Sequence, residues 1–183
     1  PGESIEQGRD LYYSITDFEM NEILHGRGRQ GAFTPAPGLK EFLQTLKRHN
    51  IKIGLVTSGL YQKAFPEIVS AFKTLDMGDP LSFYDAIITA GFRSGKGFAG
   101  NISEACVKPH PWLYSEIANI SLGIRDCKSI VGIEDSGAGV IALRLAGYQV
   151  LGMEGGNIRK SKLENACSSM NNNLCDLFEQ ILK

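Results

Sequence analysis

Three short polar segments of this sequence combine residue types that could bind a phosphate group and a divalent cation. They are Thr57-Ser58-Gly59, Lys108-Pro109-His110-Pro111 and Glu134-Asp135-Ser136-Gly137. A hydroxyl group beside backbone N–H groups suits a phosphate oxygen, a lysine supplies a positive charge, and adjacent carboxylates suit a hard cation such as Mg²⁺. Each segment also has an ordinary structural interpretation, which has to be weighed against the chemical one.

The segment from Thr57 to Gly59 follows a short apolar run at 51–57 and precedes a helical pattern. Hydroxyl groups next to the free N–H groups of a helix start favour a phosphate site. Serine and threonine are also preferred as simple helix caps. The segment by itself leaves both interpretations open.

Glu134 and Asp135 directly follow the apolar run at 129–133. Adjacent carboxylates beside a buried strand are costly unless a positive charge neutralises them, and Mg²⁺, which binds carboxylate oxygens and keeps several waters, would do so. Alternatively, Asp135 or Ser136 caps the helix that follows. Because a cap needs only one such residue, the pair of carboxylates favours the metal site.

Two prolines fix the backbone around Lys108, so this lysine is presented from a loop rather than from a helix face. Beside a phosphate and a carboxylate it would act as a point charge. The alternative is a surface lysine that precedes a proline-started helix. His110 is a weaker phosphate-binding candidate that can equally lie in a turn, and Trp112 and Tyr114 are expected to pack rather than bind.

Two glycine-containing segments resemble nucleotide-binding patterns. Ser94-Gly-Lys-Gly97 lacks the glycine and the hydroxyl residue that a phosphate-binding loop needs at its two ends. Gly137-Ala-Gly139-Val-Ile-Ala142, with Glu154 at the end of the next apolar run, matches the dinucleotide fingerprint. The carboxylates of Glu134-Asp135 would repel a pyrophosphate there unless a cation intervened, and close helix–strand packing also accounts for the glycines. A dinucleotide-binding protein therefore remains the less favoured alternative.

Apolar periodicity predicts strands that alternate with helices. Strands are expected at 51–57, 84–89, 129–133 and 148–153, and a polar loop is expected at 91–105. One or two helices are expected at 5–24, and single helices at 38–48, 61–74, 111–120 and 174–182 and from the third strand to about 146. This alternation predicts right-handed crossovers and an α/β fold with a three-layer α/β/α, Rossmann-like parallel sheet. Ligands of such sheets bind beyond the carboxyl ends of the strands, so functional residues are expected just after 57, 89, 133 and 153.

The composition excludes several classes of function. The 183 residues are 43% hydrophobic and 21% charged, as in an ordinary soluble domain. A formal net charge of −1 provides no basic field for nucleic acid or an acidic membrane, and the apolar runs are too short to span a bilayer. The four cysteines have no CxxC spacing, which favours buried free thiols and a reducing, cytoplasmic location.

Taken together, the three polar segments resemble the second, third and fourth motifs of the haloacid dehalogenase superfamily. Their order and their strand–helix context both fit, over about residues 33–153. The Glu134-Asp135-Ser136 sequence is most similar to the branch that contains β-phosphoglucomutases and sugar phosphatases. The resemblance implies an α/β core at 33–183 and, at 1–32, the C-terminal part of a helical cap with its hinge.

The resemblance implies a Mg²⁺-dependent phosphatase or phosphomutase that acts on a small phosphorylated metabolite, such as a sugar or polyol phosphate. Thr57 would bind the transferred phosphoryl group through its hydroxyl, helped by the Ser58 N–H. Lys108 would neutralise the charge of phosphate and nucleophile. Asp135 would bind Mg²⁺ directly, and Glu134 would hold it directly or through water. Lower-ranked candidates for the phosphate site are Gly59, His110 and Ser136.

The first motif of the superfamily, Asp-x-Asp-Gly-Thr, is absent from the sequence. Its first Asp attacks phosphorus and forms an aspartyl-phosphate. Asp17-Phe18-Glu19 has carboxylates at the right separation, but Met20-Asn21 replaces Gly-Thr and the segment is predicted to be helical. Loss of a central strand would leave two open strand edges and an apolar gap, so the nucleophile is expected on an upstream segment or a second chain. A catalytically inactive protein that binds a phosphorylated ligand is the alternative.

Overall fold

The computed structural model describes residues 4–27, 34–95, 98–101 and 106–182 of the chain. Its helices are α1 (Ile5–Leu24), α2 (Leu39–Arg48), α3 (Tyr61–Thr74), α4 (Pro80–Phe83), α5 (Trp112–Glu116), α6 (Gly137–Leu145) and α7 (Leu174–Ile181). Its strands are β1 (Gly54–Leu60), β2 (Ala86–Ala90), β3 (Phe92–Gly95), β4 (Phe98–Asn101), β5 (Val131–Glu134), β6 (Gln149–Met153) and β7 (Ser169–Asn171). Each helix and strand expected from the sequence has a counterpart, with ends displaced by a few residues.

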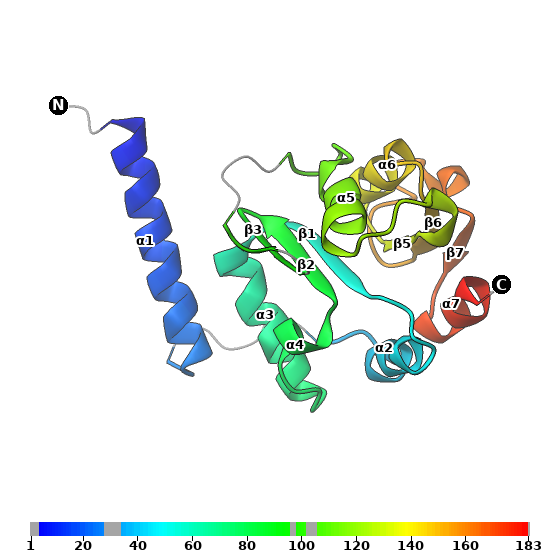
Figure 1. The fold of residues 1–183 in the computed structure, drawn as a ribbon, viewed down its shortest axis with the longest axis horizontal. Coiled ribbons are helices and arrows are strands. Elements are labelled where there is room, and N and C mark those ends of the chain that lie inside the picture. Colours follow the sequence, from blue (N-terminus) through cyan, green and yellow to red (C-terminus); the bar gives the residue numbers. More distant parts are fainter. Residues whose placement is uncertain (1–3, 28–33, 96–97, 102–105, 183) are drawn as a thin grey trace.

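The strands form two sheets rather than the single parallel sheet that was expected. One sheet has the order β1-β2-β3-β4 and the other has the order β5-β6-β7. The pairs β1–β2, β5–β6 and β6–β7 are parallel, as the alternation of strands and helices predicts. Figure 1 shows the two sheets side by side, with β1 and β5 as neighbours across the gap.

The prediction of a polar loop at 91–105 is wrong for the part that the structure describes. Strands β3 and β4 form an antiparallel hairpin that extends the first sheet from β2. Glycine and polar residues disfavour strands only weakly, because the ladder is built from backbone groups and a neighbouring strand edge can override side-chain propensity. Residues 96–97 and 102–105, which include half of the Ser94–Gly97 segment, lie outside the described residues.

Strand β1 begins and ends later than predicted. Its pairing with β2 is regular from Gly54 to Val56, is interrupted, and resumes at Leu60. Thr57-Ser58-Gly59 occupy the interruption, where backbone groups are released from the ladder. Because their backbone groups are not paired with β2, these three residues are available to bind a ligand.

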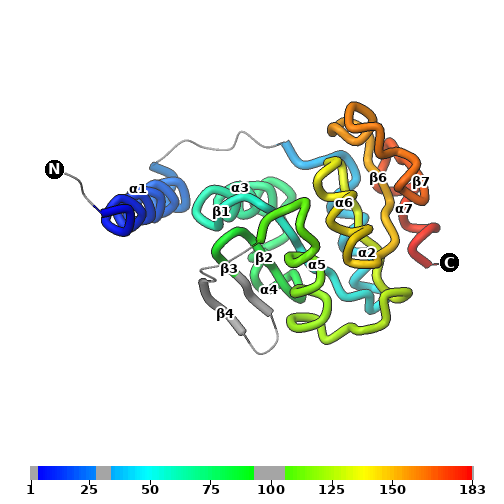
Figure 2. Tube along the Cα trace, turned by 90° about the horizontal axis from the view of Figure 1, so that it is seen from above, coloured from blue at the N-terminus to red at the C-terminus, as the bar shows by residue number. Residues whose placement is uncertain are grey.

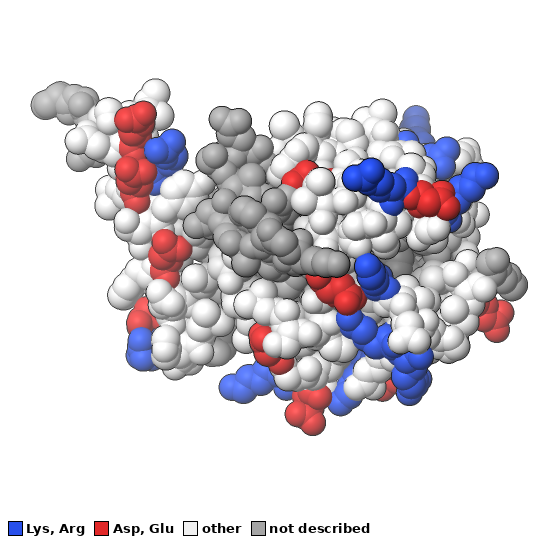
Figure 3. Space-filling view, viewed as in Figure 1, with Lys and Arg blue, Asp and Glu red and all other residues white. Residues whose placement is uncertain are grey.

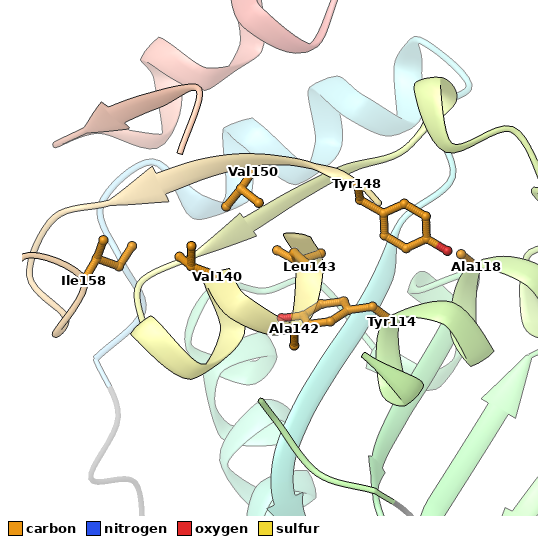
Figure 4. Packing of buried hydrophobic residues seen from close by; sticks show 8 residues of the cluster. All are labelled: Tyr114, Ala118, Val140, Ala142, Leu143, Tyr148, Val150 and Ile158. Carbon is orange, nitrogen blue, oxygen red and sulfur yellow. The ribbon is translucent and has the colours of Figure 1, made fainter. Parts of the chain in front are cut away.

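Helices cover both faces of the sheets, as the three-layer prediction requires. Val150 and Leu151 are adjacent in β6 and point to opposite faces, and each is buried in a different cluster. Val150 packs with α5 and α6 residues, which Figure 4 shows together with Tyr114 and Tyr148. Leu151 packs with residues of α2 and α7. This packing fixes the start of α6, and with it Glu134 and Asp135, relative to α5.

An apolar cavity of about 550 Å³ separates the two sheets. Its lining includes Leu55 and Val56 of β1, Val131 and Ile133 of β5, and apolar side chains of α2. Among the described residues no backbone ladder joins β1 to β5, so one edge of each strand is left unpaired inside the fold. The cavity thus lies between the open edges of these two strands and is lined mainly by apolar side chains.

Helix α1 contacts the rest of the molecule through α3. The Gln62 side chain donates to Asp17 at 2.9 Å, and Lys63 pairs with Glu19. Figures 1 and 2 place α1 at the opposite end of the molecule from β6, β7 and α7. Its apolar side chains at 11, 15 and 18 are half exposed or more. The helical prediction for Asp17-Phe18-Glu19 is therefore confirmed, and its carboxylates bind α3 rather than the site at the strand ends.

The expectation of buried thiols is wrong. Cys106, Cys127 and Cys175 are exposed and Cys167 is partly buried. The exposed residues lie in a loop, in a single turn and in the first turn of α7, where a side chain is not forced into the core. Cysteine spacing in the sequence does not show whether a thiol is buried, because burial depends on whether the residue lies on the core side or the solvent side of its helix or loop.

Candidate functional site

The carboxyl ends of β1 and β5 and the loop before α5 meet at an open pocket of about 380 Å³. It is lined by Val56, Thr57, Lys108, Ile133, Glu134, Asp135, Ser136 and Met153. The three polar segments, 26 to 51 residues apart along the chain, thus contribute to a single site. Two of the segments meet because the carboxyl ends of parallel strands lie at the same edge, and the loop before α5 brings Lys108 to that edge.

The hydroxyl groups of Thr57 and Ser58 each accept a hydrogen bond from a backbone N–H, which leaves their own protons free to be donated. Thr57 Oγ1 accepts from the Gly59 N–H at 3.1 Å, and Ser58 Oγ accepts from the Lys108 N–H at 3.2 Å. A hydroxyl that accepts one bond can still donate its proton to a ligand. The Ser58 contact also ties the loop of Lys108 to the end of β1, which fixes the relative position of two segments of the site.

Glu134 is the centre of the polar network in this pocket. The Lys108 ammonium and the Tyr114 hydroxyl both donate to its Oε1. Ser136 donates to Oε2 through its hydroxyl, at 2.9 Å, and through its N–H, at 3.3 Å. The residue is 7% exposed, so these contacts replace the water that its carboxylate would otherwise bind.

The charges of this network are mutually supporting. Burial raises the pKa of the Glu134 carboxyl, but the Lys108 charge and the hydrogen bonds from Lys108, Tyr114 and Ser136 lower it more, so the pKa lies below its ordinary value of 4.5. Burial and the nearby Glu134 charge raise the pKa of the Tyr114 hydroxyl above its ordinary value of 10. Glu134 is therefore an anion and Tyr114 a neutral donor at neutral pH.

Asp135 differs from Glu134 in being exposed to solvent. Its carbonyl accepts from the Asn157 N–H at 2.9 Å, and a side chain at Gly156 would collide with that carbonyl at 2.0 Å. The loop after β6 thus packs against the Asp135 backbone and fixes its direction. The Asp135 carboxylate faces the pocket with no protein donor described for it, which suits a group that binds a cation.

The start of α6 explains the glycines of the dinucleotide-like segment. The Ser136 side chain caps the helix by accepting from the Gly139 N–H at 3.1 Å. A Cβ at Gly139 would lie 2.0 Å from the Glu134 carboxyl carbon, and one at Gly137 would lie 2.5 Å from Ser161 Oγ. Glu154 is paired with Arg159. The glycines make room for Glu134 and Ser161, so the fingerprint carries no argument for a dinucleotide.

Ser58 and two lower-ranked candidates, His110 and Gly59, lie outside the lining of the pocket. His110 Nδ1 is 3.1 Å from the Trp112 N–H at the start of α5, which is the turn position considered from the sequence. Gly59 is exposed and contributes its N–H to Thr57. Tyr114 packs in the core as expected, but its hydroxyl contact with Glu134 had no sequence signal, because a buried tyrosine and phenylalanine follow the same apolar pattern.

The protein side chains at this site could hold Mg²⁺ only together with oxygens of a bound phosphate and water. Over the described ranges, no three His, Cys, Asp or Glu side chains are grouped so as to hold a metal ion. Mg²⁺ is commonly held by one or two carboxylates together with substrate phosphate and several waters. Asp135 supplies one exposed carboxylate beside the open pocket of about 380 Å³. Both oxygens of Glu134 already accept hydrogen bonds, which favours contact through water for this residue.

The fold and the pocket together define an α/β protein with a polar site at the carboxyl ends of its parallel strands. A family model for haloacid dehalogenase-like hydrolases matches residues 5–147. The chain therefore belongs to the haloacid dehalogenase-like hydrolases, a family of enzymes. The comparison with curated proteins found no match.

Solved structures of this superfamily share the fold. CbbY from Rhodobacter sphaeroides, in complex with phosphate, is 18% identical with a TM-score of 0.67, over 92% of this chain and 65% of that one. A variant of CbbY in complex with xylulose-(1,5)bisphosphate has a TM-score of 0.65 at 18% identity, with the same coverage of 92% and 65%. A putative β-phosphoglucomutase from Thermotoga maritima is 22% identical with a TM-score of 0.58, over 79% and 60%. The chain thus spans about 60–65% of the length of these proteins.

Figure 3 shows one face of the molecule, on which Lys and Arg side chains lie beside Asp and Glu side chains. The formal net charge of the chain is −1. None of the helices in the described part of the chain combines the length and the apolar character needed to cross a bilayer.

Proposed function

We propose that the whole protein catalyses Mg²⁺-dependent phosphoryl transfer from a small phosphorylated metabolite, through an aspartyl-phosphate formed on a segment outside this chain. The observation that carries this proposal is the shared pocket of Thr57, Lys108, Glu134 and Asp135. A hydroxyl, an ammonium group and an exposed carboxylate around one open cavity match the needs of a phosphoryl group and its counter-ion. Phosphoryl transfer depends mainly on such positioning and charge stabilisation.

Each residue of the pocket would have a separate task. The Thr57 hydroxyl and the N–H of Ser58 would donate to oxygens of the transferred phosphoryl group. Lys108 has three N–H donors, and the one that binds Glu134 leaves others for the phosphate. Asp135 would hold Mg²⁺, with Glu134 acting through water, and the bound ion would neutralise charge on the phosphoryl oxygens. These assignments apply to the chain's own residues and leave the nucleophile to another segment.

The cavity between the sheets supports the position of that segment. Its walls are mainly apolar, and among the described residues β1 and β5 both leave one edge unpaired toward it. Val56, Ile133 and Glu134 line this cavity and the polar pocket alike. A strand that filled the cavity parallel to β1 and β5 would satisfy both edges, and its carboxyl end would enter the pocket. We therefore propose that 33–183 is a core completed by one strand that carries the nucleophilic Asp.

The proposal extends to the N-terminal part of the chain. Residues 1–32 would be the closing helix of a cap together with its hinge. The half-exposed apolar side chains of α1 are consistent with a helix that packs against further cap elements. Because a cap covers the mouth of the site, substrate choice between sugar phosphate, polyol phosphate and mutase substrates would depend mainly on residues outside the pocket. The phosphate and xylulose-(1,5)bisphosphate bound to CbbY support the phosphate-ester class.

The test is phosphate release by the full-length protein from a panel of sugar and polyol phosphates. We expect turnover with Mg²⁺ and loss of turnover when EDTA removes it. Turnover that is unaffected by EDTA would refute the metal role. Denaturing mass spectrometry of the active sample identifies the segment that carries the Asp. Slower amide hydrogen exchange in β1 and β5 in its presence would support its position in the cavity.

A protein that binds a phosphorylated ligand without turnover is the second candidate. The observation that favours it is the sequence itself, which provides the pocket without the Asp-x-Asp-Gly-Thr motif. Thermal stabilisation by phosphate esters with no phosphate release, in a sample that contains the complete protein, would support this candidate. Turnover by the same sample would exclude it.

A further inference from the structure

Tyr114 is a core residue whose polar atom reaches the site. Its side chain is 8% exposed and packs with α6 and β6 residues. Its hydroxyl donates to Glu134 Oε1, the oxygen that also accepts from Lys108. The Lys108 ammonium lies 5.1 Å from the centre of the Tyr114 ring, within the range of a cation–π interaction. Tyr114 therefore touches both members of the buried ion pair.

Packing alone does not account for a tyrosine at this position. A phenylalanine would fill the same core volume without a hydroxyl group that must be paired when buried. The second tyrosine of the cluster, Tyr148, satisfies its hydroxyl elsewhere, beside Ser115 and Asn119. Figure 4 shows the two hydroxyl groups pointing in different directions, with that of Tyr148 near Ala118. The Tyr114 hydroxyl is thus the one that the core contributes to the site.

We propose that Tyr114 is a positioning residue, which fixes the Glu134 carboxylate so that Glu134 holds the Lys108 ammonium at the mouth of the phosphate pocket. Lys108 has four flexible side-chain bonds, and a single carboxylate contact would leave its ammonium free to move. The Tyr114 hydroxyl and Ser136 fix Glu134 from two sides, and the Tyr114 ring restricts Lys108 directly. The inference rests on the proposed phosphate-binding function of Lys108.

The test compares Tyr114→Phe with Tyr148→Phe in the full-length protein. Both substitutions remove one hydroxyl from the same buried cluster, but only the first removes a contact with Glu134. We expect Tyr114→Phe to weaken the binding of inorganic phosphate about tenfold, the size expected for one hydrogen bond to a charged group. Tyr148→Phe is expected to leave phosphate affinity unchanged. Equal weakening by both substitutions would overturn the proposal, because it would indicate a general effect on the core.

A double-mutant cycle tests whether Tyr114 acts through Lys108. In a Lys108→Met background, Tyr114→Phe is expected to change phosphate affinity by less than about twofold, because its target is gone. An undiminished effect there would refute the positioning role. In turnover assays Tyr114→Phe should lower kcat more than it changes KM if Lys108 acts chiefly on the transition state. Phosphate affinity is measured without turnover, so absent turnover would count against the proposed function and not against Tyr114.

A crystal structure of the Tyr114→Phe variant gives an independent answer. The proposal expects the Lys108 ammonium to leave Glu134 or to occupy several positions, while the ring at 114 stays in place. A Lys108 side chain that is ordered against Glu134 as in the native protein would overturn it.

Discussion

Two lysine–carboxylate pairs lie at opposite ends of the parallel strands and have different surroundings. Lys108 pairs with Glu134 at the carboxyl ends, with side chains 12% and 6% exposed. Lys47 pairs with Asp85 at the amino ends, at 2.6 Å, with side chains 31% and 35% exposed. The buried pair borders an open pocket, whereas the exposed pair borders the surface.

The partners of the two carboxylates show what each pair does. Asp85 also accepts from the Ile53 N–H at 2.8 Å, so it ties the approach to β1 to β2 and, through Lys47, to α2. Both partners of Asp85 therefore belong to the fold itself, and none of its contacts is directed at a ligand pocket. Glu134 gathers side-chain donors from three segments, and its partner Lys108 keeps donors that face the pocket. The comparison indicates that the exposed pair at the amino edge only joins elements of the fold, whereas the buried pair at the carboxyl edge also holds a positive charge ready for a ligand.

The largest expected effect comes from Asp135→Asn in the full-length protein. Loss of the exposed carboxylate should lower kcat/KM by about 10²–10³-fold, the cost of removing one charge-stabilising group from a phosphoryl-transfer site. Because Asp135 is exposed, the unfolding midpoint in urea should barely change. Asp176→Asn, an exposed carboxylate in the first turn of α7, is the matched control and should keep full activity. Activity within a factor of a few of wild type for Asp135→Asn would contradict the metal role.

Glu134→Gln should have the largest effect on stability. It leaves the partly enclosed Lys108 charge without its partner, which should lower the free energy of unfolding by about 3 kcal/mol, the lower end for a broken buried pair, because Lys108 borders the pocket. Urea unfolding at neutral pH measures this effect. A variant that is as stable as wild type would mean that Glu134 contributes nothing to folding. Glu134 would then serve the ligand site alone, whereas Asp85 serves the fold.

Gly139→Ala tests whether the position of Glu134 matters apart from its charge. The new methyl group would stand 2.0 Å from the Glu134 carboxyl carbon, so the carboxylate must move away from Lys108 and Tyr114. We expect phosphate affinity to fall about tenfold, as for the loss of one charged hydrogen bond. Gly8→Ala in α1, where a Cβ meets nothing within 4 Å, should be neutral or slightly stabilising. Unchanged phosphate affinity in Gly139→Ala would show that the position of the Glu134 carboxylate does not affect phosphate binding.

Asp85→Asn should have the smallest effect, and only on stability. Its carboxylate is one-third exposed, so solvent screening limits the loss to about 0.5–1 kcal/mol at neutral pH. Burial raises the pKa of Asp85, but Lys47 and the Ile53 N–H lower it more, to below the ordinary value of 3.8. A lowered folded-state pKa means that the contribution is complete above about pH 4 to 5 and is lost as pH falls through the folded-state value.

The pH dependence of the unfolding free energy checks whether the pKa of Asp85 is lowered or raised in the folded state. The difference in unfolding free energy between wild type and Asp85→Asn should be constant between about pH 5 and pH 7 and shrink below about pH 4. A difference that grows on acidification would show that Asp85 is held in its protonated form. Phosphate affinity of the full-length protein should be unchanged by this substitution, because Asp85 is remote from the pocket lining.

The sequence was most informative where signals are local. The bounds predicted for α1 and α3 agree with the structure, because a period of 3.6 residues and its interruptions lie within one segment. Thr57 and Asp135 were expected to lie near each other because parallel strands align their carboxyl ends, and the resemblance to a known family added Lys108 to the site. The hairpin of β3 and β4 was missed, because it depends on the exposed edge of β2 rather than on its own residues.

By itself, the sequence determined which chemical groups stand at the strand ends and to which family the chain belongs. Only the tertiary structure decided that Glu134 is buried while its neighbour Asp135 is exposed, that Tyr114 donates to the site, and that the sheet is divided by a cavity. The reason is physical: residue type and spacing fix local conformation, whereas burial and hydrogen-bond partners depend on which elements pack together. Two adjacent carboxylates are alike in sequence and become different once the strand and helix have been packed.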